Sequence, residues 1–289
     1  MQIVQLSGGL GNQLFQYAYY LKLKKLGCET YLDDITRYRD GKERNNQLKQ
    51  AGVSYQPAAE SDIVRLRDRD RHLHNLIRRR IFGSKDVERS EGDEITDDGY
   101  WTGYWQSAEG YSDIEAELRH NIFGVNFIDD VTKTEIRKQI ENTLSVGVHI
   151  RRGDYLSPEV INVYGGICTD EYYRSAMSYI RNNYQGCTFY VFSNDPEWVR
   201  TNYSAEDVVI MEGNDEEHGY RDMYLMSKCK HNIIANSSFS WWGAWLNSNS
   251  NKCVIGPSIW IHREGFEKVY DGLNLVKITS LGEIIDGKC

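Results

Sequence analysis

Short apolar runs alternate with amphipathic segments along the second half of the chain. The apolar runs predict β-strands, and they lie at residues 145–150, 188–193, 208–211, 232–235 and 252–256. The segments between them space apolar residues at helical intervals, which predicts helices over 169–184, 196–202, 220–229 and 239–246. Strands that alternate with helices in this way are typical of a parallel, doubly wound α/β sheet.

The first half of the chain is less regular. A β-like run at Gln2–Leu6 ends at a glycine-rich turn, and the apolar spacing after it predicts a helix that stops near Gly27. Residues 30–32 and the aromatic segment 100–104 are strand-like. Residues 63–80 predict an arginine-rich helix whose role the sequence leaves open.

Length and composition fit an ordinary globular protein with two domains. The chain has 289 residues, and at ~150 residues per domain this predicts about two domains. We place them at 1–140 and 141–289, with the option that the last helix packs back on the first domain. Hydrophobic residues make up 40% and charged residues 26% of the chain, which is the usual balance of a soluble protein.

Charge and hydropathy exclude two broad classes. The net charge of −8 argues against a general nucleic-acid binder, which is normally basic. No window approaches the ~18 apolar residues of a membrane span, and the chain begins directly with a strand, so we expect no signal peptide or anchor.

The six cysteines form no CxxC pair. We therefore expect reduced thiols in a cytoplasmic protein with at most peripheral contact to the inner membrane.

A histidine–arginine cluster, His149 to Asp154 (HIRRGD), follows the strand predicted at 145–150. Ligands of doubly wound sheets bind at the carboxyl ends of the strands. On a strand, His149 and Arg151 point to one face and Arg152 to the other. The planar fork of an arginine suits a phosphate. The alternative is a buried Arg–Asp pair that only holds the loop.

Two more polar clusters follow predicted strands. Asp195 follows the strand predicted at 188–193, and its carboxylate can accept hydrogen bonds from N1–H and N2–H of guanine. The alternative is that Asp195 is a helix N-cap, because Pro196 stands at a first-turn position. After 232–235 come Ser237 and Ser238, which can bind a phosphate together with the helix dipole or can simply cap the helix. The tryptophans that follow them at 241, 242 and 245 favour a core position.

The first turn, GGLGNQ, is a weaker signal. It is no dinucleotide fingerprint, because Leu14 stands where the third glycine belongs, and no Gly-Lys-Ser/Thr of a P-loop follows. A plain tight turn is one interpretation; the amides of Asn12 and Gln13 favour a turn that orients a polar ligand. Asp68-Arg69-Asp70 resembles a cation-binding DxD, but it lies inside the arginine-rich run at 65–80. A solvated charged face is therefore preferred there, and no metal is expected.

Taken together, four segments resemble the bacterial branch of the α-1,2-fucosyltransferases of glycosyltransferase family 11. They are SGGLGNQLFQYA, VGVHIRRGDYL, FSND and YRDMYLMSKCKHNIIANSSFSWWGAWLN, and the match runs from residue 5 to about 257. The HxRRxD block is shared with α-1,6- and protein O-fucosyltransferases, whereas NSSFSWWGAWLN is more specific. The resemblance implies a GT-B fold with two Rossmann-like lobes facing a central cleft. Residues 1–140 would be the acceptor-side lobe and 141–289 the GDP-sugar-binding lobe.

The resemblance also implies GDP-β-L-fucose as donor and a role for each motif. Arg151 would contact the donor β-phosphate, His149 would lie near the nucleotide, and Asp195 would read guanine. The serine pair would hold the phosphates, and residues 100–106 would line the acceptor side. The donor-binding candidates are Gly11, Asn12, Gln13, His149, Arg151, Asn194, Asp195, Ser237, Ser238 and Phe239.

The implied reaction inverts the anomeric carbon of fucose in a single displacement. Negative charge builds on the departing GDP, and fixed donors aimed at such charge are usually the largest catalytic contribution. Arg151 is the first candidate, supported by Arg152, Asn12 and the two serines. A base must also accept the proton of the acceptor hydroxyl. Asp154 and Glu159 are both candidates, and neither is preferred.

The predicted function is therefore inverting α-1,2-fucosyl transfer to a galactose-type acceptor in surface glycan synthesis, for example of an O-antigen. The partners would be GDP-fucose and a galactose-containing oligosaccharide or lipid-linked glycan, with no cofactor, metal or nucleic acid. One alternative is a fucosyltransferase of different linkage or acceptor. Another is a non-catalytic GDP-sugar- or glycan-binding protein, which loss of HxRRxD or of the serine pair would indicate; both are intact.

Overall fold

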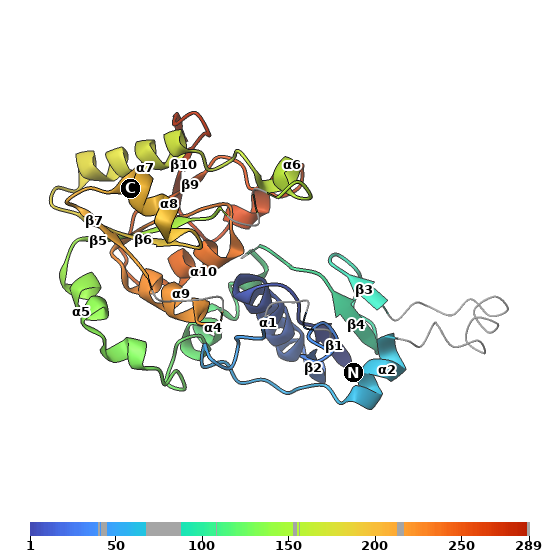
Figure 1. Cartoon of the computed structure of the whole chain (residues 1–289). Helices are drawn as coiled ribbons and strands as arrows, with labels where there is room; N and C mark the ends of the chain where they lie inside the picture. The colour runs from blue at the N-terminus through green and yellow to red at the C-terminus, as the bar shows by residue number, and fades with distance from the viewer. Residues whose placement is uncertain are drawn as a thin grey trace. The chain divides into compact units, whose positions relative to one another are not determined.

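The computed structural model describes residues 1–39, 41, 45–67, 88–107, 109–152, 155, 157–212 and 217–287 (Figure 1). The chain divides into two compact units. The first contains residues 1–106 and 110–127, and the second contains residues 107–109 and 128–289. The division predicted after residue 140 falls within helix α5 (Glu135–Asn142), which belongs to the second unit.

The first unit is built on a four-stranded parallel sheet in the order β2-β1-β4-β3. Ile3 pairs with Tyr31 on one side and with Tyr100 on the other. Helix α1 connects β1 to β2 and packs on both, as the apolar spacing predicts. The strands are β1 (Gln2–Gln5), β2 (Thr30–Asp33), β3 (Glu88–Ser90) and β4 (Gly99–Thr102), and the helices are α1 (Leu10–Lys25), α2 (Glu60–Arg67) and α4 (Glu115–Asn121).

Helix α2 covers the beginning of the arginine-rich segment. Its apolar residues Ile63 and Leu66 are buried against Ile3 and Tyr100 of the sheet. Residues 68–80, including Asp68-Arg69-Asp70, lie outside the described residues. The prediction of a solvated charged face there stays a prediction.

The second unit contains a seven-stranded sheet in the order β11-β10-β9-β8-β5-β6-β7, in which only the edge pairing of β10 with β11 is antiparallel. The five predicted strands are confirmed as β5 to β9, with small shifts at their ends, and β10 and β11 were not predicted. The bounds are β5 (Ser145–Ile150), β6 (Thr188–Ser193), β7 (Val208–Ile210), β8 (His231–Ile233), β9 (Val254–Pro257), β10 (Leu275–Ile278) and β11 (Ile284–Asp286).

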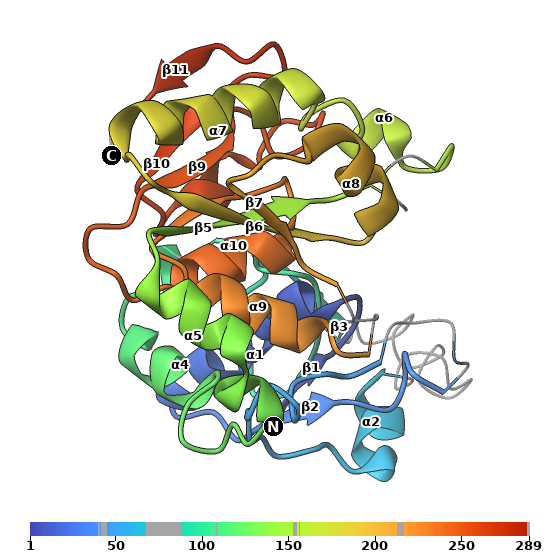
Figure 2. The same cartoon turned by 60° about the vertical axis from the view of Figure 1, so that its left-hand side comes forward.

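Helices cover both faces of this sheet. Helices α7 and α8 lie on one face and α9 and α10 on the other (Figure 2), as right-handed crossovers require. Past α10, the chain as described to residue 287 forms strands and a short 3-10 helix and no further α-helix. The helices are α5, α6 (Ile161–Tyr164), α7 (Asp170–Asn183), α8 (Pro196–Tyr203), α9 (Gly219–Lys228) and α10 (Ser238–Leu246).

The strand order contains one reversal that matters for ligands. The chain runs outward from β5 to β6 and β7 and then returns to β8, on the other side of β5. In open α/β sheets, ligands bind outside the carboxyl ends of the strands at such a switch point. The segments that follow β5 and β8 are therefore the expected location of a ligand-binding site.

In the described ranges, none of the helices is long and apolar enough to cross a membrane. Cys28, Cys168, Cys187 and Cys229 are free thiols, whereas Cys253 is disulfide-bonded, so the expectation of reduced cysteines throughout is wrong for Cys253. Cysteine spacing alone does not determine which thiols meet in space.

Candidate functional site

His149 and Phe239 meet at the switch point. His149 is buried on β5, and its ring centroid lies 5.2 Å from that of Phe239, in the first turn of α10. The His149 carbonyl oxygen accepts a hydrogen bond of 3.1 Å from the Tyr173 hydroxyl on α7. The end of β5 is thus held from both faces of the sheet.

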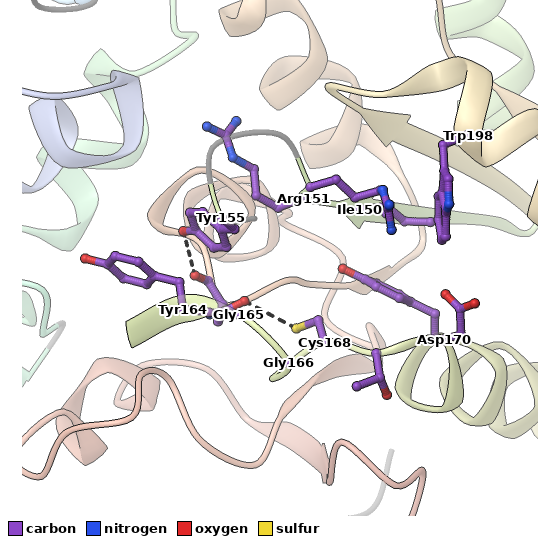
Figure 3. A pocket seen from close by; sticks show the side chains of 13 residues that line it. Ile150, Arg151, Tyr155, Tyr164, Gly165, Gly166, Cys168, Asp170 and Trp198 are labelled. Atoms are coloured by element: carbon purple, nitrogen blue, oxygen red, sulfur yellow. Dashed lines mark hydrogen bonds between the residues drawn. The ribbon is translucent and has the colours of Figure 1, made fainter. Parts of the chain in front are cut away.

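Arg151 leaves β5 toward an aromatic pair. Its guanidinium carbon lies 5.6 Å from the ring centroid of Tyr155, and the Tyr155 ring stacks on Tyr164 with centroids 4.9 Å apart (Figure 3). The Tyr155 hydroxyl donates to the backbone oxygen of Asn236 at 2.9 Å. The segment after β5 is therefore tied to the segment after β8, beside a pocket of about 300 Å³.

Arg152 contacts different elements from Arg151, although both lie past the end of β5 at Ile150, so strand alternation does not explain the difference. Its guanidinium carbon lies 3.7 Å from the ring centroid of Trp198 on α8. Its Nε is 3.5 Å from Oδ2 of Asp195, and its backbone N–H donates to the Asn194 side chain at 3.0 Å. Asp154, the acid of the HIRRGD cluster, lies outside the described residues, so the predicted alternative of an Arg–Asp pair within that cluster stays a prediction.

Asp195 is the N-cap of α8, and Pro196 follows it in the first turn. Its Oδ1 accepts from the backbone N–H of Trp198 at 3.2 Å, so the capping interpretation is confirmed. The side chain is still 39% exposed. Since each carboxylate oxygen has two lone pairs, capping leaves the residue able to bind a ligand.

Helix α10 begins at the serine pair. Ser237 is its N-cap and is buried, yet its side chain makes no capping hydrogen bond. Ser238 is the first helical residue and is half-buried. Trp241, Trp242 and Trp245 are buried, which confirms their predicted core position.

The two side-chain amides of the glycine turn in the first unit, Asn12 and Gln13, lie in different surroundings. Gln13 is fully buried; its side chain donates to the Gly8 and Asn45 carbonyl oxygens, and its oxygen accepts from the backbone of Gln47. Gln13 therefore braces the turn. Gly11 is also buried, whereas Asn12 is half-buried.

Asn12 is held by a side-chain hydrogen bond and lies close to the backbone of Gly8. The Gln106 amide donates to Asn12 Oδ1 at 2.9 Å. At Gly8, with φ of +72°, an added Cβ would lie 2.8 Å from Asn12 Nδ2, so a glycine is required there. Asn12 thus presents a fixed amide at the carboxyl end of β1.

Glu159 lies apart from these residues. It is exposed and does not line the pocket. Hydrogen bonds from its own backbone and from Ser157 hold the pKa of its carboxyl below the usual value. A general base works best with a pKa near the working pH, so this surrounding offers Glu159 no help as a base.

Sequence reasoning did not single out Tyr155, Tyr164, Trp198 or Asn236. Asn236 is buried, and its amide donates to the carbonyl oxygens of Tyr164 and Trp260. The only local signal was position: Tyr155, Trp198 and Asn236 lie within or close to the polar clusters, whereas Tyr164 lies ten residues past the nearest one. Within the ranges that the structure describes, no three His, Cys, Asp or Glu side chains gather in a way that could hold a metal ion.

The chain has two α/β units with parallel sheets, and one of them is a doubly wound unit with an arginine and a helix N-terminus at its switch point. This arrangement is that of the GT-B fold, which many glycosyltransferases adopt. The model of glycosyl transferase family 11 matches residues 57–267, and the chain belongs to this family.

Curated relatives agree with this assignment. The chain is 33% identical over 278 residues to the α-1,2-colitosyltransferase of Escherichia coli, covering 91% of this chain and 93% of that protein. It is 32% identical over 283 residues to the E. coli O-antigen biosynthesis glycosyltransferase WbnK, with coverage of 88% and 93%. Galactoside α-(1,2)-fucosyltransferase 1 of Ateles belzebuth is 37% identical over 103 residues, which are 35% of this chain and 28% of that protein.

Solved structures show the same fold at low sequence identity. NodZ α-1,6-fucosyltransferase co-crystallised with GDP superposes with a TM-score of 0.53 at 13% identity, covering 99% of this chain and 98% of that chain. A mutant of Arabidopsis thaliana FUT1 in complex with GDP gives a TM-score of 0.50 at 11% identity, with coverage of 88% of this chain and 70% of that chain. The predicted GT-B fold class is confirmed.

Proposed function

We propose that this enzyme is an inverting α-1,2-fucosyltransferase that moves L-fucose from GDP-β-L-fucose to a galactose-type acceptor in O-antigen or related surface glycan synthesis. Two observations carry the proposal: His149 on β5 contacts Phe239 in the first turn of α10, and Tyr155, which lies by Arg151, donates to Asn236 just before that helix. The α-1,2 linkage and the O-antigen setting are supported by the names of the E. coli relatives. We place the enzyme in the cytoplasm, with at most peripheral contact to the membrane.

In this proposal the donor diphosphate binds between Arg151 and the start of α10. The helix dipole and the N–H groups of its first turn favour an anion, and the Ser237 and Ser238 hydroxyls add donors. Asp195, with Asn194 beside it, accepts from guanine. Because arginine and helix together neutralise the leaving GDP, the proposal needs no metal.

The acceptor hydroxyl attacks the anomeric carbon from the face opposite GDP, and its proton passes to a base. The carbon–oxygen bond to GDP breaks as the new glycosidic bond forms, which inverts the configuration. Asp154 and Glu159 remain the proposed candidates for the base, and the lowered pKa of the Glu159 carboxyl counts against Glu159. In the first unit, Asn12 is proposed to bind a polar group of a substrate, while Gln13 holds the turn.

A second donor is favoured by one specific relative, because the E. coli protein with 33% identity is a colitosyltransferase. Colitose is fucose without its 3-hydroxyl group, so the same phosphate and guanine contacts would serve both donors. The proposal of fucose therefore concerns the sugar pocket alone and can fail while the GDP site stands.

The decisive measurement is transfer from GDP-fucose and from GDP-colitose to a panel of β-galactosides with EDTA present, with the product linkage determined by NMR. We expect α-1,2-fucosylated product from the wild type. Arg151→Ala should lower kcat by about 10²–10³-fold, the usual effect of removing one charge-stabilising donor.

The matched control is Arg200→Ala, an exposed arginine on α8 that pairs with Glu197 and Glu212. It should retain wild-type transfer. Transfer of colitose but not of fucose would show that colitose is the donor sugar. A product with another linkage would contradict the α-1,2 assignment. If the protein binds neither GDP-fucose nor GDP-colitose, the proposed site is refuted.

A further inference from the structure

The two adjacent arginines of the HxRR block are not equivalent in the structure. Arg151 lies by Tyr155, whereas Arg152 is held by three contacts to one short segment after β6. Asn194 binds its backbone, Asp195 faces its Nε, and Trp198 covers its guanidinium. Trp198 lies on the side of the pocket opposite Tyr155 and Tyr164 (Figure 3).

We propose that Trp198 and Arg152 form a positioning pair that holds the Asp195 carboxylate in the orientation needed to recognise the guanine of the donor. The inference rests on the proposed function, because it takes GDP as the nucleotide and Asp195 as its reader. It assigns Arg152 to base selectivity and leaves the diphosphate to Arg151.

Trp198 affects both oxygens of the Asp195 carboxylate, one through its own backbone N–H and the other through Arg152. Its backbone N–H donates to Asp195 Oδ1 at 3.2 Å. Its ring lies under the arginine whose Nε is 3.5 Å from Asp195 Oδ2. The carboxylate is therefore hydrogen-bonded at one oxygen by the helix, and its other oxygen faces the stacked arginine at ion-pair distance without a hydrogen bond from Nε.

The stack is itself held in place. The Trp198 ring centroid lies 5.6 Å from that of Tyr203, at the other end of α8. Tyr203 is buried, and its hydroxyl donates to Asp170 at the start of α7. Because a guanidinium is planar and delocalised, it can lie flat on an indole while its N–H groups point outward in the plane. A lysine ammonium cannot do both.

Orientation matters because guanine presents two parallel donors, N1–H and N2–H, which one carboxylate can accept side by side only in a single plane. The Asp195 side chain is 39% exposed and that of Arg152 is 27% exposed, so the carboxylate remains accessible. Hypoxanthine keeps N1–H but lacks the N2 amino group. Inosine diphosphate, IDP, therefore measures the second hydrogen bond.

The test is calorimetric titration of the full-length protein with GDP and with IDP, for the wild type, Trp198→Leu, Trp198→Phe and Arg152→Lys. We expect the wild type to prefer GDP. Trp198→Leu and Arg152→Lys should each lower the GDP-to-IDP preference by about 5- to 30-fold, the range of a stacking contact of this kind, mainly through weaker GDP binding. Trp198→Phe keeps a ring face and should retain most of the preference.

Two controls separate positioning from loss of fold. Arg200→Lys makes the same exchange on the exposed part of α8 and should change neither constant, and thermal unfolding should show each variant folded. The double variant Arg152→Lys/Trp198→Leu should be no worse than the poorer single variant, because the two residues act as one unit.

The outcomes distinguish the inference from the function beneath it. If the wild type does not bind GDP, the proposed function fails. If the wild type binds GDP but Arg152→Lys weakens GDP and IDP by the same factor, Arg152 contacts the phosphates and the inference is overturned. Equal binding of GDP and IDP by the wild type, or an unchanged preference in Trp198→Leu, overturns it as well.

Discussion

Two N-cap residues of the second unit behave differently although their types suggest the same role. Asp195 caps α8 through its carboxylate, whereas Ser237 stands at the N-cap of α10 and makes no side-chain capping bond. A hydroxyl that does not cap contributes little to helix stability. The absence of a capping bond fits the proposed contact of the Ser237 hydroxyl with the donor phosphates.

Replacing Ser237 tests this directly. Ser237→Ala should leave the free energy of unfolding nearly unchanged but weaken GDP binding by about tenfold, the effect of one lost hydrogen bond to a charged group. The matched control is Thr134→Ala, because the Thr134 hydroxyl does cap α5. That variant should lose about 1 kcal/mol of stability and bind GDP normally. A stability loss in Ser237→Ala with unchanged GDP binding would restore the simple-cap interpretation.

At the scale of elements, strand β5 depends on close approach to its neighbours. Gly147 lies at the centre of this buried strand, and an added Cβ would lie 3.1 Å from Cys229 Sγ and 3.1 Å from Asn232 Nδ2. Asn232 is fully buried on β8 and donates to the Met226 carbonyl oxygen of α9. The glycine thus lets β5, β8 and the end of α9 pack together below the switch point.

A side chain at Gly147 should separate these elements. Gly147→Val is expected to lower the free energy of unfolding by about 1–3 kcal/mol, the usual cost of overpacking a core, despite the better strand propensity of valine. Urea unfolding followed by circular dichroism measures the change. Gly110→Val is the control, because nothing lies within 4 Å of its added Cβ. Equal stability of the two variants would contradict the packing argument.

At the scale of the whole molecule, hydrogen bonds hold a carboxylate at the point where the chain enters the second unit. Asp129 follows the division between the units and accepts from the Tyr220 hydroxyl at 2.7 Å, from Arg221 and from the Val131 backbone. Burial alone would raise the pKa of this carboxyl, but the hydrogen bonds and Arg221 outweigh burial and lower it. The entry of the chain is thereby fixed to α9, which packs on α10.

This anchor predicts a pH-dependent stability. Because the folded-state pKa of Asp129 is lowered, its contribution is present above the unfolded value of about 3.9 and is lost as the pH falls below it. Asp129→Asn should cost about 1–3 kcal/mol at neutral pH. The difference from wild type in urea unfolding should shrink below about pH 4. A difference that stays constant down to about pH 3 would show that the charge of Asp129 is not what matters.

Much of the second unit could be predicted because its signals are local. Strands β5 to β9 and the helices between them follow from apolar spacing over short windows, and the polar clusters follow from the ends of those strands. Strands β10 and β11 were missed, because Leu275–Ile278 and Ile284–Asp286 are short and gain their pairing only from the sheet edge that is already formed.

The sequence by itself determined the family, the doubly wound pattern and the clusters at the strand ends, because motif and periodicity are properties of neighbouring residues. Only the tertiary structure decided which member of each adjacent pair faces which partner. Arg151 lies by Tyr155 while Arg152 lies on Trp198, and Asn12 contacts Gln106 while Gln13 is buried. The Arg152–Trp198 and Asn12–Gln106 contacts join residues far apart in the chain. They depend on how strands and helices pack, which a local pattern does not encode.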